Sequence, residues 1–211
     1  LGQKTAALGI DLIMHSVTKY VGGHGDAVGG AVTGRKALIS QIRGESAIHH
    51  GGVMSPFNAW LVARGLSLLP MRMRAHQAGA QAISEWLEAQ PQVTRVIYPG
   101  LKSHPQYDLA QNQMSNTSGM ISFQVGDATI GRKIAQQMID RLEIVHYAVS
   151  LGHHRSLIFW METQGLMDSS FRLSGTQLES YRSYAGDGVF RMSVGLEDPE
   201  DLIRDLSGAL S

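Results

Sequence analysis

Apolar positions near the start of the chain predict two strands followed by helices. Residues 10–18 are rich in β-branched and apolar side chains and end at a run of glycines, as expected for a buried strand entering a tight loop. Residues 26–33 resemble a second short strand, and residues 35–43 change to a helical pattern. Another helix is expected to begin where Ser55 can cap it, with Pro56 in its first turn.

A long helix is expected at residues 71–90, beginning just after Pro70. Its apolar side chains recur at spacings of seven, three and four residues, which places them on one helix face. These residues are Met73, Ala80, Ile83 and Leu87. Because a helix of this length can connect two domains, the sequence predicts a domain junction near Pro70.

Strands and helices alternate over the rest of the chain. The expected strands are residues 93–98, 119–125, 144–148 and 188–194, and the expected helices are residues 105–114, 130–141 and 199–210. The last helix has Asp198 and Glu200 near its start, where the helix dipole favours acidic side chains. This alternation predicts the α/β fold class.

Charge, cysteine content and the length of apolar runs argue against several classes of partner. The chain has 18 basic and 18 acidic residues, and its formal net charge of zero gives no field that would attract nucleic acid or an anionic membrane. The absence of cysteine removes disulfides, thiolate nucleophiles and cysteine zinc sites, and it fits a reducing cytoplasm. Apolar runs such as residues 157–161 are too short to span a bilayer.

The clearest candidate for chemistry is Lys19, at the end of the first expected strand. Burying an ammonium group without a partner is costly, and covalent use would explain a lysine there, since its amine can form an imine with an aldehyde cofactor. In an extended strand Ser16 and Thr18 point to one side, where both could donate hydrogen bonds to a phosphate on that cofactor. On spacing alone, a strand that simply ends at the surface also fits these residues.

Two weaker patterns do not predict a ligand. The pairs His49-His50 and His153-His154 could suggest a metal, but adjacent side chains point apart and no acidic cluster accompanies them. The loop beginning at Gly23 lacks the third glycine of the dinucleotide-binding pattern at its required spacing, and the sequence contains no P-loop. We therefore expect neither a metal site nor a nucleotide site.

The segment around Lys19 resembles the cofactor-binding segment of a known enzyme family. SVTKY at residues 16–20, with GHGD at 23–26 and GG at 29–30, is similar to the Schiff-base segment of the Cys/Met metabolism family. That family uses pyridoxal 5'-phosphate (PLP) and includes cystathionine γ-synthase, cystathionine and methionine lyases, and O-acylhomoserine sulfhydrylases. The further similar segments are SPF at 55–57, RGL at 64–66, RM at 72–73 with His76, YPGL at 98–101, HP at 104–105, GMISF at 119–123, VSLG at 149–152 and RMSVGLE at 191–197.

The resemblance spans nearly the whole chain, and it implies a fold and an assembly. The implied fold is that of the PLP-dependent transferases, fold type I. Residues 1–70 would form the C-terminal part of the large PLP-binding domain, and residues 71–211 a long connecting helix and the smaller C-terminal α/β domain. Family members are usually homotetramers built as dimers of dimers, and they act on small amino acids.

The resemblance also assigns roles to five residues. It implies that Lys19 holds the cofactor and is the catalytic base, and that Ser16 and Thr18 contact the cofactor phosphate. Arg191 would bind the substrate carboxylate, for which the planar guanidinium is well suited, and Ser150 would help to position that carboxylate.

A structural role for Arg191 stays open on the residues alone. An ion pair with Glu197 or Asp198 fits the sequence equally well.

The implied reaction is elimination at the γ-carbon of methionine or cystathionine, which yields a 2-oxo acid, ammonia and a thiol. The alternative is γ-replacement, as in cystathionine γ-synthase or O-acylhomoserine sulfhydrylase. After Gly152, the sequence HHRSLIFWM at residues 153–161 departs from the pattern of methionine and cystathionine lyases. This departure leaves the exact reaction open, and a truncated, non-catalytic module of the same fold is a third possibility.

Part of the family's catalytic machinery has no counterpart in this sequence. Family members carry an aspartate at the pyridine nitrogen, a tyrosine on the cofactor ring and phosphate ligands from a neighbouring subunit, all before the lysine. Asp11 lies too close to Lys19 to be that aspartate. The sequence therefore predicts a piece of a longer enzyme whose upstream half is absent, with a natural truncation as the alternative.

Overall fold

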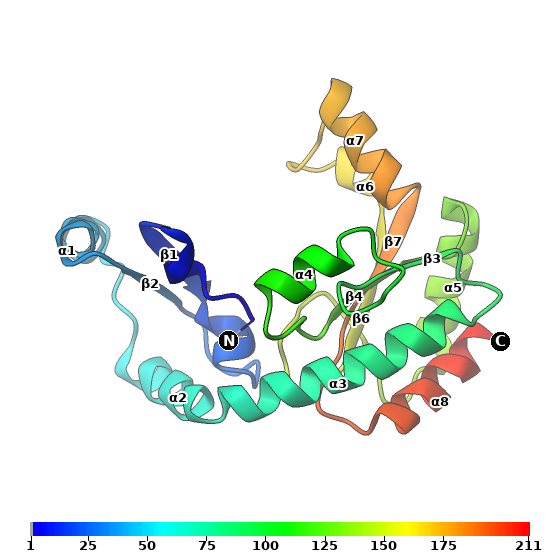
Figure 1. Cartoon of the computed structure of the whole chain (residues 1–211), viewed down its shortest axis with the longest axis horizontal. Coiled ribbons are helices and arrows are strands. Elements are labelled where there is room, and N and C mark those ends of the chain that lie inside the picture. The colour runs from blue at the N-terminus through cyan, green and yellow to red at the C-terminus, as the bar shows by residue number, and fades with distance from the viewer. Residues whose placement is uncertain (1) are drawn as a thin grey trace.

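The computed structural model describes residues 2–211, which form two regions connected by one long helix. This helix, α3, runs from Leu69 to Glu88. The N-terminal region, residues 2–68, lies at the start of this helix, and a five-stranded sheet with its helices lies along the rest of it (Figure 1). We refer to residues 69–211 as the C-terminal region. The predicted domain boundary at residue 70 stays a prediction.

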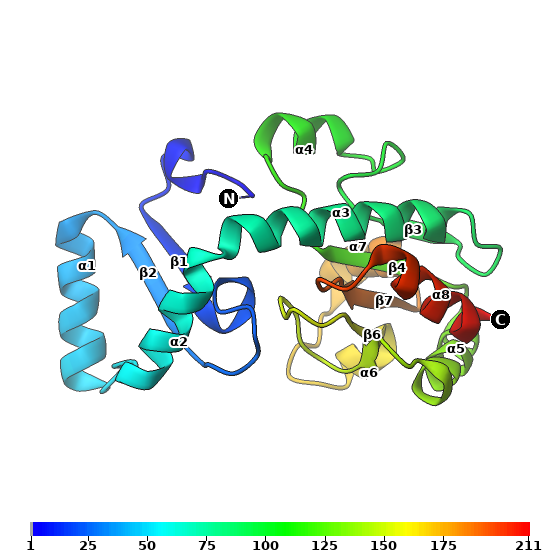
Figure 2. The same ribbon diagram turned by 90° about the horizontal axis from the view of Figure 1, so that it is seen from below.

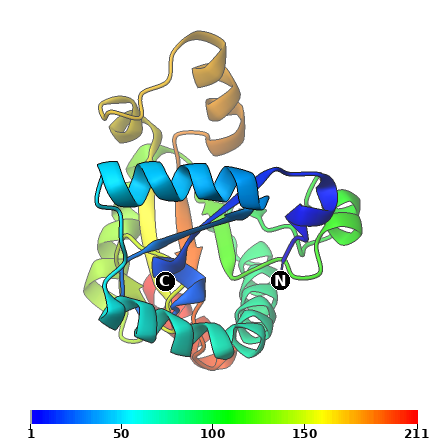
Figure 3. The same cartoon turned by 90° about the vertical axis from the view of Figure 1, so that its left-hand side faces the viewer.

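The N-terminal region contains a two-stranded sheet and two helices. Its elements are a 3-10 turn at Thr5–Leu8, β1 at Leu12–Ser16, a helical turn at Val17–Val21, β2 at Gly30–Gly34, α1 at Lys36–Arg43 with a wider turn at Gly44–His49, and α2 at Pro56–Ser67. The two strands are antiparallel, and α1 contacts β2 (Figure 3). The helix expected at residues 35–43 is thus confirmed.

The first expected strand is shorter and less buried than its sequence predicts. β1 ends at Ser16, and the residues after it form the helical turn. Met14 is 79% exposed, and the buried cluster of this region consists of Val17, Ala27 and Val62. β1 is antiparallel to its neighbour β2. An apolar run becomes a buried strand only when layers cover both faces, and the described residues do not supply those layers.

The second expected strand is displaced along the sequence. β2 begins at Gly30, four residues later than the prediction of residues 26–33. The loop between Val21 and Gly30, which we call the glycine loop, is therefore longer than the sequence predicts. Gly29 is its last residue, and the Gly29 carbonyl accepts a hydrogen bond from the Val17 amide at 3.0 Å.

The helices α2 and α3 are confirmed, together with the signals that predict them. Ser55 Oγ accepts a hydrogen bond from the Asn58 amide at 3.2 Å, and Pro56 is the first residue of α2. In α3 the predicted apolar face is buried, and its members Met73, Ala80, Ile83 and Leu87 contribute to the interior. Local periodicity and capping were sufficient to predict this part of the chain.

The C-terminal region is built on a mixed sheet in the order β3-β4-β7-β6-β5. β4 and β6 flank β7 and are antiparallel to it, whereas β5 is parallel to β6. The strands are β3 at Arg95–Ile97, β4 at Met120–Gln124, β5 at His146–Tyr147, β6 at Leu157–Glu162 and β7 at Gly188–Ser193. The predicted α/β fold class is confirmed.

Helices α3, α5 and α8 pack together against this sheet, as Figure 2 shows, whereas α6 and α7 project away from it (Figure 1). The helix bounds are α4 at Tyr107–Gln113, α5 at Ala128–Arg141, α6 at Thr163–Met167, α7 at Gly175–Ala185 and α8 at Pro199–Leu210. Within residues 2–211 we find no helix that combines the length and the apolar character needed to cross a membrane.

The sequence pattern does not predict β6, α6 or α7. β6 includes the apolar run at residues 157–161, and a short continuous apolar run does not distinguish a strand from a buried helical segment. It lies inside the sheet and places Trp160 against Phe190, with 4.9 Å between ring centroids. Phe190 also stacks on Phe123 at 5.1 Å, so β6 completes an aromatic centre of the core.

Candidate active site

Lys19 lies in the helical turn that follows β1. The Gly22 amide donates to the Val17 carbonyl at 2.9 Å, and the Gly23 amide donates to the Lys19 carbonyl at 2.8 Å. The backbone leaves helical values at Lys19 itself, where φ is −88° and ψ is −134°. The turn holds Lys19 partly buried, with its amine directed toward the C-terminal region: Nζ donates to Ser150 Oγ at 3.3 Å.

Ser16 and Thr18 do not share one strand face as predicted, because Thr18 belongs to the helical turn. Thr18 Oγ1 accepts a hydrogen bond from the Gly29 amide at 2.9 Å and donates to the Gly29 carbonyl at 3.3 Å. The Ser16 side chain is exposed. The prediction that alternation along a strand aligns the two hydroxyls is therefore wrong, although their role toward a phosphate stays a prediction.

Arg72, from α3, fixes the glycine loop to the junction of α2 and α3. Its guanidinium donates to the carbonyls of Tyr20 at 2.8 Å, Val21 at 3.2 Å and Gly65 at 2.7 Å. The side chain is buried, and burial lowers its pKa. Gly23 has a positive φ of 77°, and a Cβ there would lie 2.0 Å from the guanidinium. Only glycine lets the loop approach this cation so closely.

Residues 149–155, the segment between β5 and β6, lie directly against the Lys19 turn. Gly152 has a positive φ of 75°, and a Cβ there would lie 2.6 Å from the Tyr20 nitrogen and 3.0 Å from the Lys19 carbonyl carbon. The Gly152 amide donates to Ser193 Oγ at 2.9 Å, and the His154 amide donates to the Gly23 carbonyl at 2.9 Å. This segment therefore contacts both the Lys19 turn and β7.

Three of the five predicted site residues come together at this contact. Besides the Lys19 amine near Ser150 Oγ, Arg191 on β7 directs Nη2 toward the Ser150 carbonyl at 3.5 Å. An amine, a hydroxyl and a guanidinium thus converge from three separate segments. Ser16 precedes the turn and Thr18 is its second residue, and neither side chain forms a hydrogen bond to these three groups in the described residues.

The alternative ion pair of Arg191 is not present among residues 2–211. Glu197 instead accepts hydrogen bonds from the Ser156 amide at 2.7 Å and from its hydroxyl at 2.8 Å. Asp198 caps α8 by accepting from the Glu200 amide at 2.8 Å. Because both carboxylates have other partners, the guanidinium of Arg191 stays available for a carboxylate from outside the chain.

His153 belongs to the site, although the sequence pattern singles it out only as a doubtful metal ligand. Its Nε2 lies 3.3 Å from Ser150 Oγ, which is the same oxygen that the Lys19 amine contacts. The ring rests on Gly25, where a Cβ would lie 2.4 Å from Cε1 and where φ is 73°. The glycine-rich loop was the available signal, since a glycine with positive φ also leaves room for a neighbouring ring.

The pKa of His153 lies below its usual value, mainly because the imidazole is partly buried. Nearby positive charges lower it further, and one carboxylate opposes them. In order of decreasing effect these groups are Lys19, His154 and Arg155, with Asp26 acting in the opposite direction. The neutral imidazole is therefore the dominant form at neutral pH.

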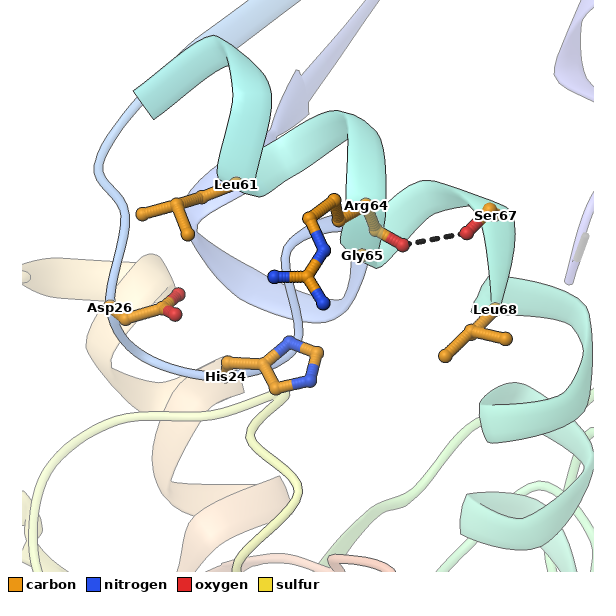
Figure 4. Close-up of a pocket in the computed structure, with 7 residues that line it drawn as sticks. All are labelled: His24, Asp26, Leu61, Arg64, Gly65, Ser67 and Leu68. Atoms are coloured by element: carbon orange, nitrogen blue, oxygen red, sulfur yellow. Dashed lines mark hydrogen bonds between the residues drawn. The ribbon is translucent and has the colours of Figure 1, made fainter. Parts of the chain in front are cut away.

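A separate pocket of about 340 Å³ lies behind the glycine loop (Figure 4). Figure 4 shows residues of the loop, of α2 and of the α2–α3 junction around it: His24, Asp26, Leu61, Arg64, Gly65, Ser67 and Leu68. His24 Nδ1 lies 2.7 Å from the Gly22 carbonyl oxygen, which fixes the ring at the edge of the pocket. Lys19 does not line this pocket, so the converging groups described above form a different site.

The donor groups on the Lys19 side fit a phosphorylated aldehyde. A partly buried amine is next to a hydroxyl and near a guanidinium, and the exposed Ser16 hydroxyl has no hydrogen-bond partner within residues 2–211. Thr18 can donate to a phosphate only by giving up its 3.3 Å bond to the Gly29 carbonyl. An amine able to anchor an aldehyde and a guanidinium able to bind a carboxylate are thus present, and one phosphate contact would require a rotation of the Thr18 hydroxyl.

Comparisons with known proteins agree with this chemistry. Residues 1–211 match the family described as Cys/Met metabolism PLP-dependent enzyme. A canavanine gamma-lyase from Pseudomonas canavaninivorans is 41% identical over 207 residues, which cover 96% of this chain and 48% of the relative. An L-methionine gamma-lyase from Treponema denticola is 40% identical over 209 residues, 99% of this chain and 50% of the relative.

A solved structure has the same fold. The cystathionine gamma synthase from Xanthomonas oryzae pv. oryzae, in complex with aminoacrylate and cysteine, matches with a TM-score of 0.83 and 36% identity. The match covers 99% of this chain and 52% of that chain. The fold-type-I architecture expected from the sequence is therefore confirmed, and the chain spans about half the length of the curated relatives it matches.

Proposed function

This chain belongs to the Cys/Met metabolism PLP-dependent enzyme family, and we propose that it supplies the cofactor lysine and the carboxylate-binding arginine of an enzyme that eliminates the γ-substituent of a sulfur amino acid. The observation that carries this proposal is the convergence of Lys19, Ser150 and Arg191 from three distant segments. Methionine and cystathionine are the proposed substrates, and the products are a 2-oxo acid, ammonia and a thiol.

The bound cofactor would supply an electron-accepting ring that stabilises the negative charge left when a proton leaves the substrate's α-carbon. Lys19 anchors the cofactor through Nζ, and the freed amine takes up the α-proton as a general base. Ser150 Oγ, 3.3 Å from Nζ, orients that amine. Arg191 binds the substrate carboxylate through its planar fork, and Ser16 and Thr18 contact the cofactor phosphate.

The second candidate reaction is γ-replacement by an incoming thiol. It is favoured by the likeness to a cystathionine gamma synthase solved with cysteine, and by residues 153–161, which depart from the lyase pattern. Both reactions share the steps assigned to Lys19 and Arg191. They differ in whether a second substrate must enter after the γ-substituent leaves, so the need for an added thiol distinguishes them.

The anchor is tested by reducing the purified full-length protein with borohydride in the presence of PLP and mapping the adduct by mass spectrometry. Wild type is expected to carry a pyridoxyl group on Lys19, and Lys19→Ala is expected to carry none. Lys102→Ala is the matched control, because this lysine lies in an exposed turn, and it should retain the adduct.

The reaction is tested with the same preparation. Release of a 2-oxo acid and ammonia from methionine without added thiol supports elimination, and product that appears only with an added thiol supports replacement. A full-length protein with neither adduct nor product would instead be a non-catalytic module of this fold.

We propose further that the full-length protein is a cytoplasmic homotetramer, a dimer of dimers, with small amino acids as its substrates. The absence of cysteine and the family resemblance support this assignment. Light scattering on the purified full-length protein tests it, and the expected mass is four times that of one subunit.

A further inference from the structure

A chain of three polar groups leads from the Lys19 amine to an imidazole that the proposed reaction does not use. Lys19 Nζ donates to Ser150 Oγ at 3.3 Å, and the same oxygen lies 3.3 Å from His153 Nε2. A hydroxyl has one proton and two lone pairs. If Oγ receives the amine proton on a lone pair, its own proton is free to point at Nε2.

The position of His153 is fixed independently of Ser150. Its ring lies on Gly25, in a space that exists only because that residue has no side chain. On the far side, Gly152 lies against the backbone of the Lys19 turn and leaves no room for a Cβ. The imidazole, the hydroxyl and the amine are therefore held between two glycine contacts, which limits their relative motion.

We infer that His153 is a positioning residue, which accepts the Ser150 hydroxyl proton and thereby turns a lone pair of Ser150 toward the Lys19 amine. This inference rests on the proposed role of Lys19. A neutral imidazole accepts through Nε2. A protonated imidazole donates instead, and it then competes with Lys19 for the lone pairs of Ser150.

Partial burial of the imidazole, and secondarily the charges around it, lower the pKa of His153 and keep the accepting form populated at neutral pH. Lys19 on the turn, and His154 and Arg155 on its own segment, disfavour the imidazolium, while Asp26 on the glycine loop favours it. Protonation therefore requires a pH below the ordinary value for histidine. Wild-type activity should fall over that acidic range to a lower level, because Ser150 no longer orients the amine.

The experiment compares kcat/KM for methionine as a function of pH in the full-length holoenzyme and two variants. His153→Gln keeps an acceptor that does not titrate, so it is expected to retain near-neutral activity and to lack the acidic transition. His153→Ala removes the acceptor and is expected to stay, over the whole pH range, about tenfold below the neutral-pH activity of the wild type, the fold-change that corresponds to one lost hydrogen bond.

A second readout does not depend on turnover. The absorbance of the Lys19-bound cofactor, recorded without substrate, is expected to shift with the same acidic midpoint in wild type and to lack this shift in His153→Gln. His154→Gln is the matched control, because His154 carries a neighbouring imidazole without a hydrogen bond to Ser150 in the described residues. It should retain the transition, with a midpoint at slightly higher pH because the electrostatic effect by which His154 lowers the pKa of His153 is lost.

The outcomes separate this inference from the proposed function. If wild type carries no pyridoxyl group on Lys19, the proposed function is wrong and the positioning role is wrong with it. If the adduct is present but all variants show the same pH profile and the same absorbance, only the positioning role is overturned. Equal losses in the Gln and Ala variants at all pH values would likewise overturn it, since they would indicate packing alone.

Discussion

The two regions of this chain differ in how they are held together. The C-terminal region surrounds one large apolar core, with Phe190 fully buried at its centre. The N-terminal region has a cluster of only three buried apolar residues, and it exposes Phe57 and Trp60 by more than half. Its glycine loop is instead held by contacts with α3 and with residues 149–155. The geometry of the candidate site therefore depends on the hydrogen bonds and close contacts between the two regions.

The largest expected effect comes from comparing the same substitution, Phe to Ala, in the core of the C-terminal region and on the surface of the N-terminal region. Phe190→Ala removes a ring that stacks on Phe123 and meets Trp160, and it should cost about 3–5 kcal/mol of unfolding free energy. Phe57→Ala, at a side chain that is 65% exposed, should change stability by less than about 0.5 kcal/mol. Urea unfolding of the 211-residue chain measures both values. A cost at Phe57 as large as that at Phe190 would contradict the contrast.

The second prediction concerns the hydrogen bonds by which Arg72 holds the start of the glycine loop. Arg72→Met keeps the length of the side chain but removes the donors to three carbonyls, which should cost about 2–4 kcal/mol. Arg74→Met, on the exposed side of the same helix, is the control and should be nearly neutral. Hydrogen exchange should rise in residues 17–26 in the first variant only. Unchanged hydrogen exchange in residues 17–26 would mean that contacts other than those of Arg72 are sufficient to hold this segment.

The third prediction tests the close approach of the 149–155 segment to the Lys19 turn. Gly152→Ala combines a strained positive φ with a clash against two backbone atoms, and it should cost about 1–3 kcal/mol. Gly165→Ala in α6 meets nothing within 4 Å and should be neutral or stabilising by about 0.5–1 kcal/mol. Thermal unfolding compares the two variants. If both behave alike, the approach at Gly152 does not constrain the site.

The smallest expected effect is a pH dependence at the contact between the regions. His76 is fully buried, and its Nδ1 donates to the Val194 carbonyl at 2.8 Å. The centroids of the His76 and Tyr20 rings are 5.1 Å apart. Burial lowers the pKa of His76, so the unfolded chain binds its proton more readily than the folded chain. This stability is present above the unfolded pKa of about 6.5 and is lost as the pH falls toward the folded pKa.

His76→Gln should therefore flatten the acidic loss of stability. Below pH 6.5 the unfolding free energy should depend more steeply on pH in the wild type than in the variant. The two slopes should differ by at most about 1.4 kcal/mol per pH unit, which corresponds to the uptake of one proton. Urea midpoints between pH 5 and pH 8 measure this difference. Identical slopes would mean that His76 takes up its proton equally well in the folded state.

The sequence by itself determined the elements whose signals are local. The helical spacing in α3, the Ser55 cap and the acidic residues at the start of α8 each depend on residues within about two turns of one helix, and all three are present. The family resemblance also pointed to Lys19 before any contact was known. Short segments with distinctive composition were thus sufficient to predict the fold class and the principal candidate residue.

The tertiary structure alone decided the environment of that residue. Lys19 and Ser150 are 131 positions apart, and no local pattern encodes their 3.3 Å contact or the place of His153 beside it. It also decided that the first strand stops at Ser16 and that β6 fills the sheet, because both depend on which layers cover an apolar run. Periodicity records the preference of a segment, whereas burial and long-range contacts arise only when distant segments pack together.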